Sequence, residues 1–437
     1  MKLNLKGKNV LVYGMGISGQ SSAKLLHDKG ACVSIFDDEE RFINHFAYEK
    51  NPMLKKFDLV VVSPGIKVLG NPLISHFIMT KTPLISELDL GFLFCRGKVI
   101  AITGTNGKTT VTSLVGEIFK KAGRNTFVCG NIGLPISTIV PKTDQNSVTV
   151  CEVSNFQLEL SSHFSANDAC VLNLAPDHLD RHGNFEEYLR VKKKILTGKH
   201  GQKVVLNFDD ELTSKLKIDK KTLFFSKKML NKGVFIKNNC IYYNKIKIMP
   251  ISEIPLFGEK NLENVLAGVC MAVLEKIKPD IIRQAVREFK APRHRLEYLG
   301  EYNGASVFDD SKATNIASTI GAVESIGDKK TIILLGGQNK DFKFDEIFNR
   351  EWDFEKILCF GEAGQDIFEC AQKYGYSPLL FPTMKQATHY VKTIAQEGMK
   401  ILLSPACASF DEFSSYAVRG DIFKEIIFDE TKKIESP

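Results

Sequence analysis

The sequence contains a glycine-rich segment of the kind that binds phosphate groups. Residues 103–110 read TGTNGKTT and stand between an apolar run at 98–103 and a stretch of helical periodicity at 108–121. In that context backbone N–H groups and the helix dipole would cradle phosphates, Lys108 would reach the β- and γ-phosphates, and a following threonine hydroxyl would hold Mg²⁺. Ile102 stands where the full P-loop pattern has its first glycine. The segment is therefore either a variant P-loop or a solvated glycine turn, and its strand–loop–helix context favours the first.

A second cluster combines histidines and carboxylates directly after an apolar run. Residues 177–182 read DHLDRH and follow VLNLAP. Residues at strand ends line the ligand crevice of α/β folds, where one His and two Asp could bind a hard cation. A helix N-terminus with an exposed flank explains the same residues equally well. Glu152 ends another apolar run, and it gains a metal role only as a partner of Thr109 around Mg²⁺.

A third motif, GMGISG at residues 14–19, follows the apolar run 8–13, and Asp37 lies 18 residues beyond it. This spacing fits the dinucleotide fingerprint, in which glycines let the backbone approach a pyrophosphate at a helix N-terminus. Another diphosphate, such as a nucleotide sugar, would use the same physics. A tight turn without any ligand is the remaining interpretation.

Further polar segments stand at 292–295 (PRHR), 309–315 (DDSKATN) and 404–410 (SPACASF). They follow predicted strands or a hinge, and could bind a ligand or form ordinary turns. Cys407 could be a nucleophile, although the sequence pairs no His with it and buried Cys is usually inert. The lysine run 192–194 would by default lie on a solvated helix face.

Alternating strands and helices predict parallel βαβ units. We expect an α/β fold with three domains. These are residues 1–92, residues 93–291, which contain the P-loop-like segment, and residues 292–437. Residues 222–249 carry short runs (TLFFS, GVFIK, CIYYNKIKIMP) that predict a small antiparallel sheet in the central domain. Short linkers near 91–97 and 290–295 predict hinged domains.

The composition narrows the class of protein. The chain has 437 residues, 43% hydrophobic and 25% charged, which is typical of a globular protein and excludes disorder, collagen and coiled coil as global descriptions. The net charge of +7 suits anionic small substrates and does not by itself indicate nucleic acid. No apolar stretch reaches about 18 residues, so we expect no membrane span. Ten cysteines without a C-x-x-C pair indicate reduced thiols in the cytoplasm.

Taken in order, the motifs resemble those of the Mur ligases of bacterial peptidoglycan synthesis. The ordered set is TGTNGKTT, GNIG (130–133), DHLDRH, Tyr188-x-x-x-Lys192, NLENVLA (261–267), PRHRLE, DDSKATN, GGQNK (336–340) and SPACASFDEF. The resemblance covers essentially the whole chain. It implies Rossmann-like first and third domains around a P-loop ATPase-like central domain. DSKATN, LLGG and LSPACASFDEF with a following RG resemble the family member that adds D-glutamate to UDP-N-acetylmuramoyl-L-alanine.

The resemblance also implies a reaction and a set of residues. The substrate carboxylate takes the γ-phosphoryl of ATP to give an acyl phosphate, and the amine of D-glutamate displaces phosphate; the protein positions the reactants and neutralises negative charge. The implied catalytic residues are Lys108, Glu152, His178, Lys192 and Lys312. The ATP phosphates would contact Gly104, Thr105, Asn106, Gly107, Lys108, Thr109 and Thr110. The adenine side would involve Asn131, Asn261 and Asn264, and the ribose and phosphates would meet Arg295 and Asp310 across the hinge.

Further roles follow from the same resemblance. Two Mg²⁺ ions are implied, one held by Thr109 and Glu152 and one by His178 and Lys192, with Lys192 carbamylated by CO₂. The carboxylates of D-glutamate would contact Lys312, Thr314, Lys340, Ser409 and Tyr416. The UDP moiety would face Ile17, Ser18, Asp37, Ser63 and Gly65. We expect a cytoplasmic monomer with no nucleic-acid or membrane partner.

Two positions depart from the family pattern, since Tyr416 replaces an expected Phe and GGQNK replaces the more usual GGxDK or GGDGK. Three other functions are considered: a Mur ligase for another amino acid such as a diamino acid, an NAD-dependent oxidoreductase, and a non-catalytic nucleotide-binding regulator. The oxidoreductase leaves TGTNGKTT and DHLDRH without a role, and the regulator predicts nucleotide binding without turnover.

Overall fold

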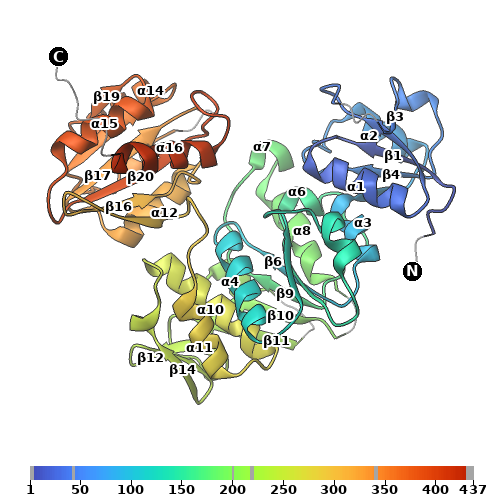
Figure 1. Ribbon diagram of the computed structural model, residues 1–437, viewed down its shortest axis with the longest axis horizontal. Helices are drawn as coiled ribbons and strands as arrows, with labels where there is room; N and C mark the ends of the chain where they lie inside the picture. The colour runs from blue at the N-terminus through green and yellow to red at the C-terminus, as the bar shows by residue number, and fades with distance from the viewer. Residues whose placement is uncertain (1–3, 42–44, 199–200, 217–220, 339–342, 430–437) are drawn as a thin grey trace. The chain divides into compact units, whose positions relative to one another are not determined.

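The structure, a computed structural model, describes residues 4–41, 45–198, 201–216, 221–338 and 343–429. The chain divides into two compact units, one formed by Met1–Pro255 with Glu263–Phe289 and one by Leu256–Leu262 with Lys290–Pro437. Three sheets with flanking helices make up these units (Figure 1), two in the first and one in the second.

The first sheet is five-stranded and parallel, in the order β3-β2-β1-β4-β5. Its strands are β1 (Asn9–Tyr13), β2 (Cys32–Phe36), β3 (Ala47–Tyr48), β4 (Leu59–Val62) and β5 (Leu84–Ser86). Its helices are α1 (Ile17–Asp28), α2 (Pro72–Met79) and α3 (Glu87–Phe94). The strand order reverses direction between β1 and β4, and in open parallel sheets ligands bind in the crevice outside the strand ends at such a point. The loops after β1 and β4 therefore form a candidate ligand edge.

The second sheet has nine strands, in the order β14-β13-β12-β11-β10-β9-β6-β8-β7. Its strands are β6 (Lys98–Thr103), β7 (Thr126–Gly130), β8 (Val148–Glu152), β9 (Asp168–Val171), β10 (Lys203–Asn207), β11 (Lys221–Ser226), β12 (Val234–Lys237), β13 (Cys240–Tyr243) and β14 (Ile246–Pro250). Its helices are α4 (Lys108–Lys121), α5 (Ile136–Ile139), α6 (Asn155–Leu158), α7 (Leu179–His182), α8 (Phe185–Lys193), α9 (Glu211–Ser214), α10 (Glu259–Leu274) and α11 (Pro279–Glu288). Helix α4 covers one face, while α3, α5 and α8 bury apolar side chains on the other.

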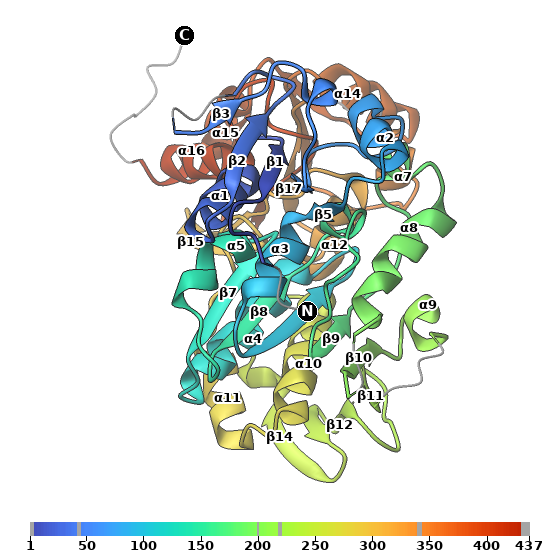
Figure 2. The ribbon, with the colours of Figure 1, turned by 90° about the vertical axis from the view of Figure 1, so that its right-hand side faces the viewer.

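The small antiparallel sheet differs in part from the prediction. Strands β12, β13 and β14 are antiparallel, but they continue the edge of the parallel sheet, as Figure 2 shows beyond β10 and β11. Strand β11, predicted to be antiparallel, pairs parallel with β10. The short helix α9 connects β10 to β11, and a crossover of this kind returns the chain in the same direction.

The third sheet has the order β15-β16-β20-β17-β18-β19 and is parallel except for the edge strand β15. Its strands are β15 (Glu297–Tyr302), β16 (Ala305–Asp309), β17 (Thr331–Gly336), β18 (Lys356–Phe360), β19 (Leu379–Phe381) and β20 (Lys400–Ala406). Its helices are α12 (Ile316–Ile326), α13 (Asp345–Phe348), α14 (Gly364–Lys373), α15 (Met384–Ile394) and α16 (Tyr416–Phe428). Separate apolar clusters fill the two faces of this sheet, which explains why its central strands are apolar on both sides.

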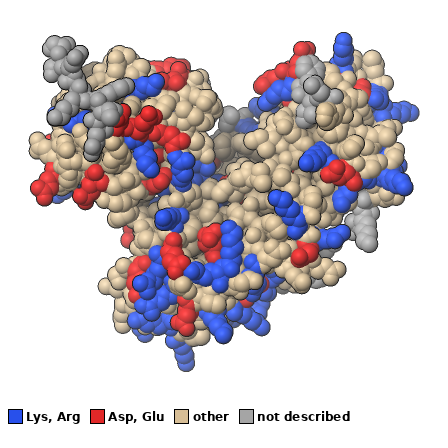
Figure 3. All heavy atoms as spheres, viewed as in Figure 1, with Lys and Arg blue, Asp and Glu red and all other residues tan. Residues whose placement is uncertain are grey.

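The predicted α/β fold is confirmed, and the structure builds it on three sheets. The predicted domain boundaries stay predictions, and the one after residue 92 falls inside α3. Among the described residues we find no helix that is both long and apolar enough to cross a membrane. Cationic and anionic side chains lie interspersed on the face drawn in Figure 3.

Candidate active site

The loop between β6 and α4 has a backbone that requires glycine. Gly107 adopts a φ of +81°, and a Cβ there would lie 2.2 Å from Oδ1 of Asn264 on α10. Lys108, the first residue of α4, folds back and donates from Nζ to the carbonyl oxygens of Gly104 (2.9 Å) and Thr105 (2.7 Å). The loop is therefore compact, with an ammonium group at its centre and the N-terminus of a 14-residue helix behind it.

Lys192 reaches the same loop from α8. Its side chain is buried, 3% exposed, and Nζ donates to Gly104 O at 3.0 Å. Burial, with a smaller contribution from the neighbouring Lys108 ammonium, holds the pKa of Lys192 well below its usual value. Lys193 is exposed, and Nζ of Lys194 instead donates to carbonyls at the end of α6. Lys192 therefore does not lie on a solvated helix face, the default expectation for this lysine run, but is buried against the glycine-rich loop between β6 and α4.

Glu152, at the end of β8, carries a buried carboxylate that the protein satisfies only in part. Its Oε1 accepts a hydrogen bond from Asn131 Nδ2 at 2.8 Å, whereas the buried Oε2 has no hydrogen-bond partner in the described part of the chain. The buried Oδ1 of Asn155 likewise has no hydrogen-bond partner among the described residues. A buried acceptor left unmatched is costly, and carboxylate and amide oxygens are preferred ligands of hard cations. The donor set therefore fits a Mg²⁺ ion.

A pocket of about 120 Å³ lies between Lys108, Lys192 and Asn131, the hydrogen-bond partner of Glu152. It is lined by Lys108, Asn131, Ser154, Asn155, Phe156, Asp177, His178, Tyr188 and Lys192. His178 has a positive φ of 52°, and its ring centroid lies 4.7 Å from that of Phe156. Strands β7, β8, β6 and β9 are neighbours in the sheet, so the segments that follow their carboxyl ends meet at one edge. Thr109, buried at the start of α4, follows Lys108 at the same edge.

The predicted UDP-binding residues lie at the ligand edge of the first sheet. Gly14 has a φ of +90°, and a Cβ there would lie 2.9 Å from Cβ of Ser63. Ile17 and Ser18 begin α1, and Gly65 follows Ser63 in the loop after β4. The loops after β1 and β4 thus approach each other at Gly14 and Ser63, and the binding of UDP by these residues stays a prediction.

Asp37 is not arranged as the dinucleotide fingerprint requires. Its oxygens accept hydrogen bonds from the backbone N–H groups of Met15 and Glu39 and from Nε of Arg41. Burial opposes ionisation, but these donors hold the pKa of Asp37 below its usual value. Since protein donors already engage the carboxylate that would bind a ribose, the NAD interpretation loses support.

In the second unit, the predicted residues gather around the ends of β16 and β20. Asp310 is buried and accepts hydrogen bonds from Leu296 N (3.0 Å) and Ser404 Oγ (2.9 Å). Burial raises the pKa of Asp310 to about 7. Lys312 holds its Nζ 5.1 Å from the centroid of the Tyr416 ring. Ser409 is buried, Arg295 and Thr314 are partly buried, and Lys340 lies outside the described residues.

Arg419 is a site-forming residue that the sequence reasoning did not single out. It is fully buried on α16 and donates to Oγ and the carbonyl of Ser311 and to the carbonyls of Cys407 and Ala408. It therefore fastens the loop after β16 to the loop after β20. The only signal in the sequence is the RG pair that follows LSPACASFDEF. Cys407 is buried, which raises the pKa of its thiol to about 12 and argues against a nucleophilic role.

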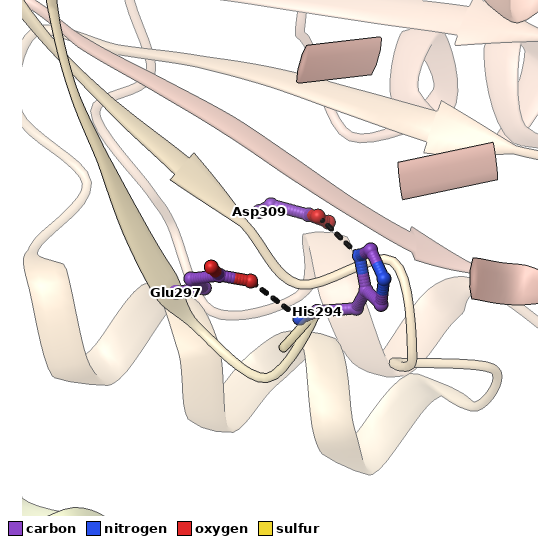
Figure 4. Close-up of side chains that lie close together, drawn as sticks. All are labelled: His294, Glu297 and Asp309. Atoms are coloured by element: carbon purple, nitrogen blue, oxygen red, sulfur yellow. Dashed lines mark hydrogen bonds and ion pairs between the residues drawn. The ribbon is translucent and has the colours of Figure 1, made fainter. Parts of the chain in front are cut away.

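His294 begins a buried polar cluster at the start of the second unit (Figure 4). Its Nδ1 lies 2.7 Å from Oδ2 of Asp309, and its backbone N–H donates to Oε2 of Glu297 at 2.8 Å. The three residues could place ligand atoms within 4.8 Å of one another. Because they already bind each other, we assign them a structural role in shaping the PRHRLE segment. A Cβ at Gly420 would lie 2.2 Å from Nδ1 of His294, so this glycine lets α16 approach the cluster.

Asn131 and Asn264 lie with the phosphate loop, whereas Asn261 belongs to the second unit, where its Nδ2 donates to Phe257 O. The approach of Arg295 and Asp310 to a nucleotide across the hinge stays a prediction.

Family models match most of the chain. Residues 102–272 match the Mur ligase middle domain, and residues 294–407 match the Mur ligase, glutamate ligase domain. The chain belongs to the Mur ligase family. A UDP-N-acetylmuramoylalanine--D-glutamate ligase of Thermoanaerobacter sp. (strain X514) is 38% identical over 97% of this Mur ligase and 99% of the relative. An enzyme of the same name from Clostridioides difficile (strain 630) is 36% identical over 97% of this chain and 99% of the relative.

Solved structures agree on the fold of this Mur ligase. The UDP-N-acetylmuramate-alanine ligase MurC of Thermotoga maritima superposes with a TM-score of 0.64 at 18% identity, covering 96% of this chain and 98% of that one. The MurF ligase of Thermotoga maritima, solved in complex with ADP, gives a TM-score of 0.60 at 17% identity, covering 97% and 95%. At these identities the likeness extends to the fold alone.

Proposed function

We propose that this Mur ligase joins D-glutamate to UDP-N-acetylmuramoyl-L-alanine with the hydrolysis of ATP, and that it acts in the cytoplasm as a monomer. The match of 38% identity over 97% of the chain to a relative with that activity in its name carries the choice of substrates. The phosphate loop, with Lys108, Lys192 and the unmatched oxygen of Glu152 beside it, supports the use of a nucleotide with Mg²⁺. Ten free cysteines, most of them buried, support a reducing compartment.

The residues of the first unit stabilise negative charge. The N–H groups of the loop and the Lys108 ammonium would hold the phosphates while the γ-phosphoryl group passes to the substrate carboxylate. Thr109 and Glu152 would hold one Mg²⁺, and His178 and Lys192 the second; the ions, when bound, supply charge neutralisation. Lys108, His178 and Lys192 line one small pocket, and Asn131, the hydrogen-bond partner of Glu152, lines it too, which supports holding the phosphoryl group and the carboxylate close together.

Lys192 requires a chemical change to serve as a ligand, because an ammonium group offers donors and no acceptor. We propose that Lys192 first loses a proton to solvent and that the neutral amine then adds to CO₂ through Nζ with release of a second proton, which gives a carbamate anion with two oxygen atoms. The burial of Lys192 and the nearby Lys108 ammonium support this assignment, since the first disfavours a protonated amine and the second would balance the anion. The carbamate oxygens would then suit Mg²⁺.

The second unit would bind D-glutamate. Lys312, Thr314, Lys340, Ser409 and Tyr416 offer cations and hydroxyl groups to two carboxylates. The buried Arg419 holds the loops that carry Lys312 and Ser409. A diamino acid would place an ammonium group among the lysines, which costs like-charge repulsion. We therefore expect diamino acids to be disfavoured, and the name of the 38% identical relative supports D-glutamate over L-glutamate.

The test is phosphate release from ATP in the presence of UDP-N-acetylmuramoyl-L-alanine and a panel of amino acids. The proposal predicts release that requires both the UDP substrate and D-glutamate. Equal turnover with meso-diaminopimelate would support the alternative Mur ligase. Nucleotide binding without turnover on any amino acid would support a regulator.

A further inference from the structure

Arg181, in the DHLDRH segment, joins the two sheets of the first unit through one guanidinium group. Its Nη2 donates to the carbonyl oxygens of Pro64 (2.9 Å) and Ile66 (2.7 Å), which belong to the loop after β4. Its Nε and Nη2 also form a bidentate pair with Glu159, at 2.8 and 2.6 Å. The side chains of Arg181 and Glu159 are only 10% and 8% exposed. The pair is therefore largely shielded from water. Charge-assisted hydrogen bonds are stronger in such a buried environment than on the exposed surface.

The same guanidinium group also reaches the metal side of the site. Its central carbon lies 4.0 Å from the ring centroid of Phe156, and the Phe156 centroid in turn lies 4.7 Å from the ring centroid of His178. Phe156 and His178 both line the pocket beside Lys108 and Lys192. A continuous set of contacts thus runs from the loop after β4, through Arg181 and Phe156, to His178.

The two ends of this set have different tasks in the proposed reaction. The loop after β4 carries Ser63 and Gly65, which would face the UDP moiety, and it packs so closely that Gly14 has no room for a side chain. His178, with a positive φ of 52°, sits only three residues before Arg181 and would help hold a metal ion. A lysine ammonium at this position could donate to carbonyl oxygens, but it lacks the planar fork with which Arg181 binds the Glu159 carboxylate and the two carbonyl oxygens at once in fixed directions.

We infer that Arg181 is a positioning residue that fixes the UDP-binding loop relative to His178, so that the bound UDP substrate presents its carboxylate to the phosphate loop. This inference rests on the proposed function. The role of Arg181 goes beyond an ion pair. The carboxylate of Glu159 alone would balance the charge of the guanidinium group, whereas the two hydrogen bonds to carbonyl oxygens contact the loop after β4 directly.

The test compares Arg181→Lys with Arg190→Lys in the full chain. Arg190 makes the same kind of bidentate pair with Glu187, at 2.6 Å on both arms, but it is exposed on α8 and is the matched control. We expect Arg181→Lys to raise the KM for UDP-N-acetylmuramoyl-L-alanine about tenfold and to lower kcat about tenfold, with the KM for ATP within twofold of wild type. Arg190→Lys should keep all three constants within twofold.

A merely structural role would lower the melting temperature and the folded fraction without moving the KM of one substrate alone. Wild-type constants in folded Arg181→Lys, or equal rises in the KM for ATP and for the UDP substrate, would overturn the inference. Hydrogen exchange of residues 63–66 provides a second readout that does not depend on turnover: faster exchange in Arg181→Lys supports the inference, and unchanged exchange overturns it. Absence of turnover in the wild-type protein would instead refute the proposed function.

Discussion

The substitution Gly107→Ala separates backbone strain from damage to the nucleotide site. Gly107 has a φ of +81°, and forcing an L-residue into the left-handed region costs about 1–2 kcal/mol. In addition, the new Cβ would lie 2.2 Å from Oδ1 of Asn264, so the loop or α10 must move by roughly 1 Å. Gly123, just beyond the other end of α4, has a φ of +75° with nothing within 4 Å of an added Cβ, and is the matched control.

Both alanine variants should lose about 1–2 kcal/mol of unfolding free energy, since the strain is common to them. Gly107→Ala should also lower kcat/KM for ATP about 100-fold, because a shift of roughly 1 Å in a phosphate-binding loop can cost this much. Gly123→Ala should leave kcat/KM unchanged. Denaturant unfolding and phosphate release measure the two effects. A Gly107→Ala protein with wild-type kcat/KM, or an equal kinetic loss in Gly123→Ala, would show that the close approach of Gly107 to Asn264 does not matter for the use of ATP.

Two further predictions concern buried charged residues. Lys192→Ala should be nearly inactive and partly rescued by short carboxylates. Lys193→Ala should resemble wild type, because Lys193 is exposed on α8. Full activity of Lys192→Ala in the phosphate-release assay would contradict the metal-ligand role. Burial raises the pKa of Asp310 to about 7, so the folded protein favours the protonated carboxyl group. The contribution of this group to the free energy of unfolding is therefore complete below about pH 4 and is lost as the pH rises to about 7. Wild type should therefore lose about 2 kcal/mol more unfolding free energy than Asp310→Asn between pH 5 and pH 8. Parallel pH profiles of the two proteins in denaturant unfolding would show that Asp310 is not the titrating group.

The phosphate loop could be predicted from the sequence because its requirements are local. Glycines, Lys108 and the start of a helix stand within one short segment, and the preceding strand is apolar. The pairing of Glu152 with Asn131 could not be read in this way, since it depends on β7 and β8 being neighbours. The unmatched oxygen of Glu152 likewise becomes visible only when every partner within reach is known.

The same limit explains the other differences. Arg181 and Arg419 are single residues in polar segments, and their importance comes from carbonyl groups that are distant in the sequence. The parallel pairing of β11 was missed because a short strand near a polar turn resembles a hairpin strand, and only its crossover through α9 determines its direction. For Asp37, the spacing fitted a dinucleotide fingerprint, whereas the donors that engage its carboxylate, two backbone N–H groups and Arg41, become visible only in the folded chain.

The central claim is that this Mur ligase activates a substrate carboxylate with ATP and then forms an amide with D-glutamate. Isotope transfer tests it most directly: UDP-N-acetylmuramoyl-L-alanine labelled with ¹⁸O in its carboxylate is incubated with ATP, Mg²⁺ and D-glutamate, and the phosphate and the product are analysed by mass spectrometry. Attack of a carboxylate oxygen on the γ-phosphorus, followed by displacement by the amine, leaves one substrate oxygen in the released phosphate. Activation of the carboxylate by ATP should give singly labelled phosphate in equal amount with the D-glutamyl amide. Unlabelled phosphate, or phosphate released without the amide, would rule out this reaction.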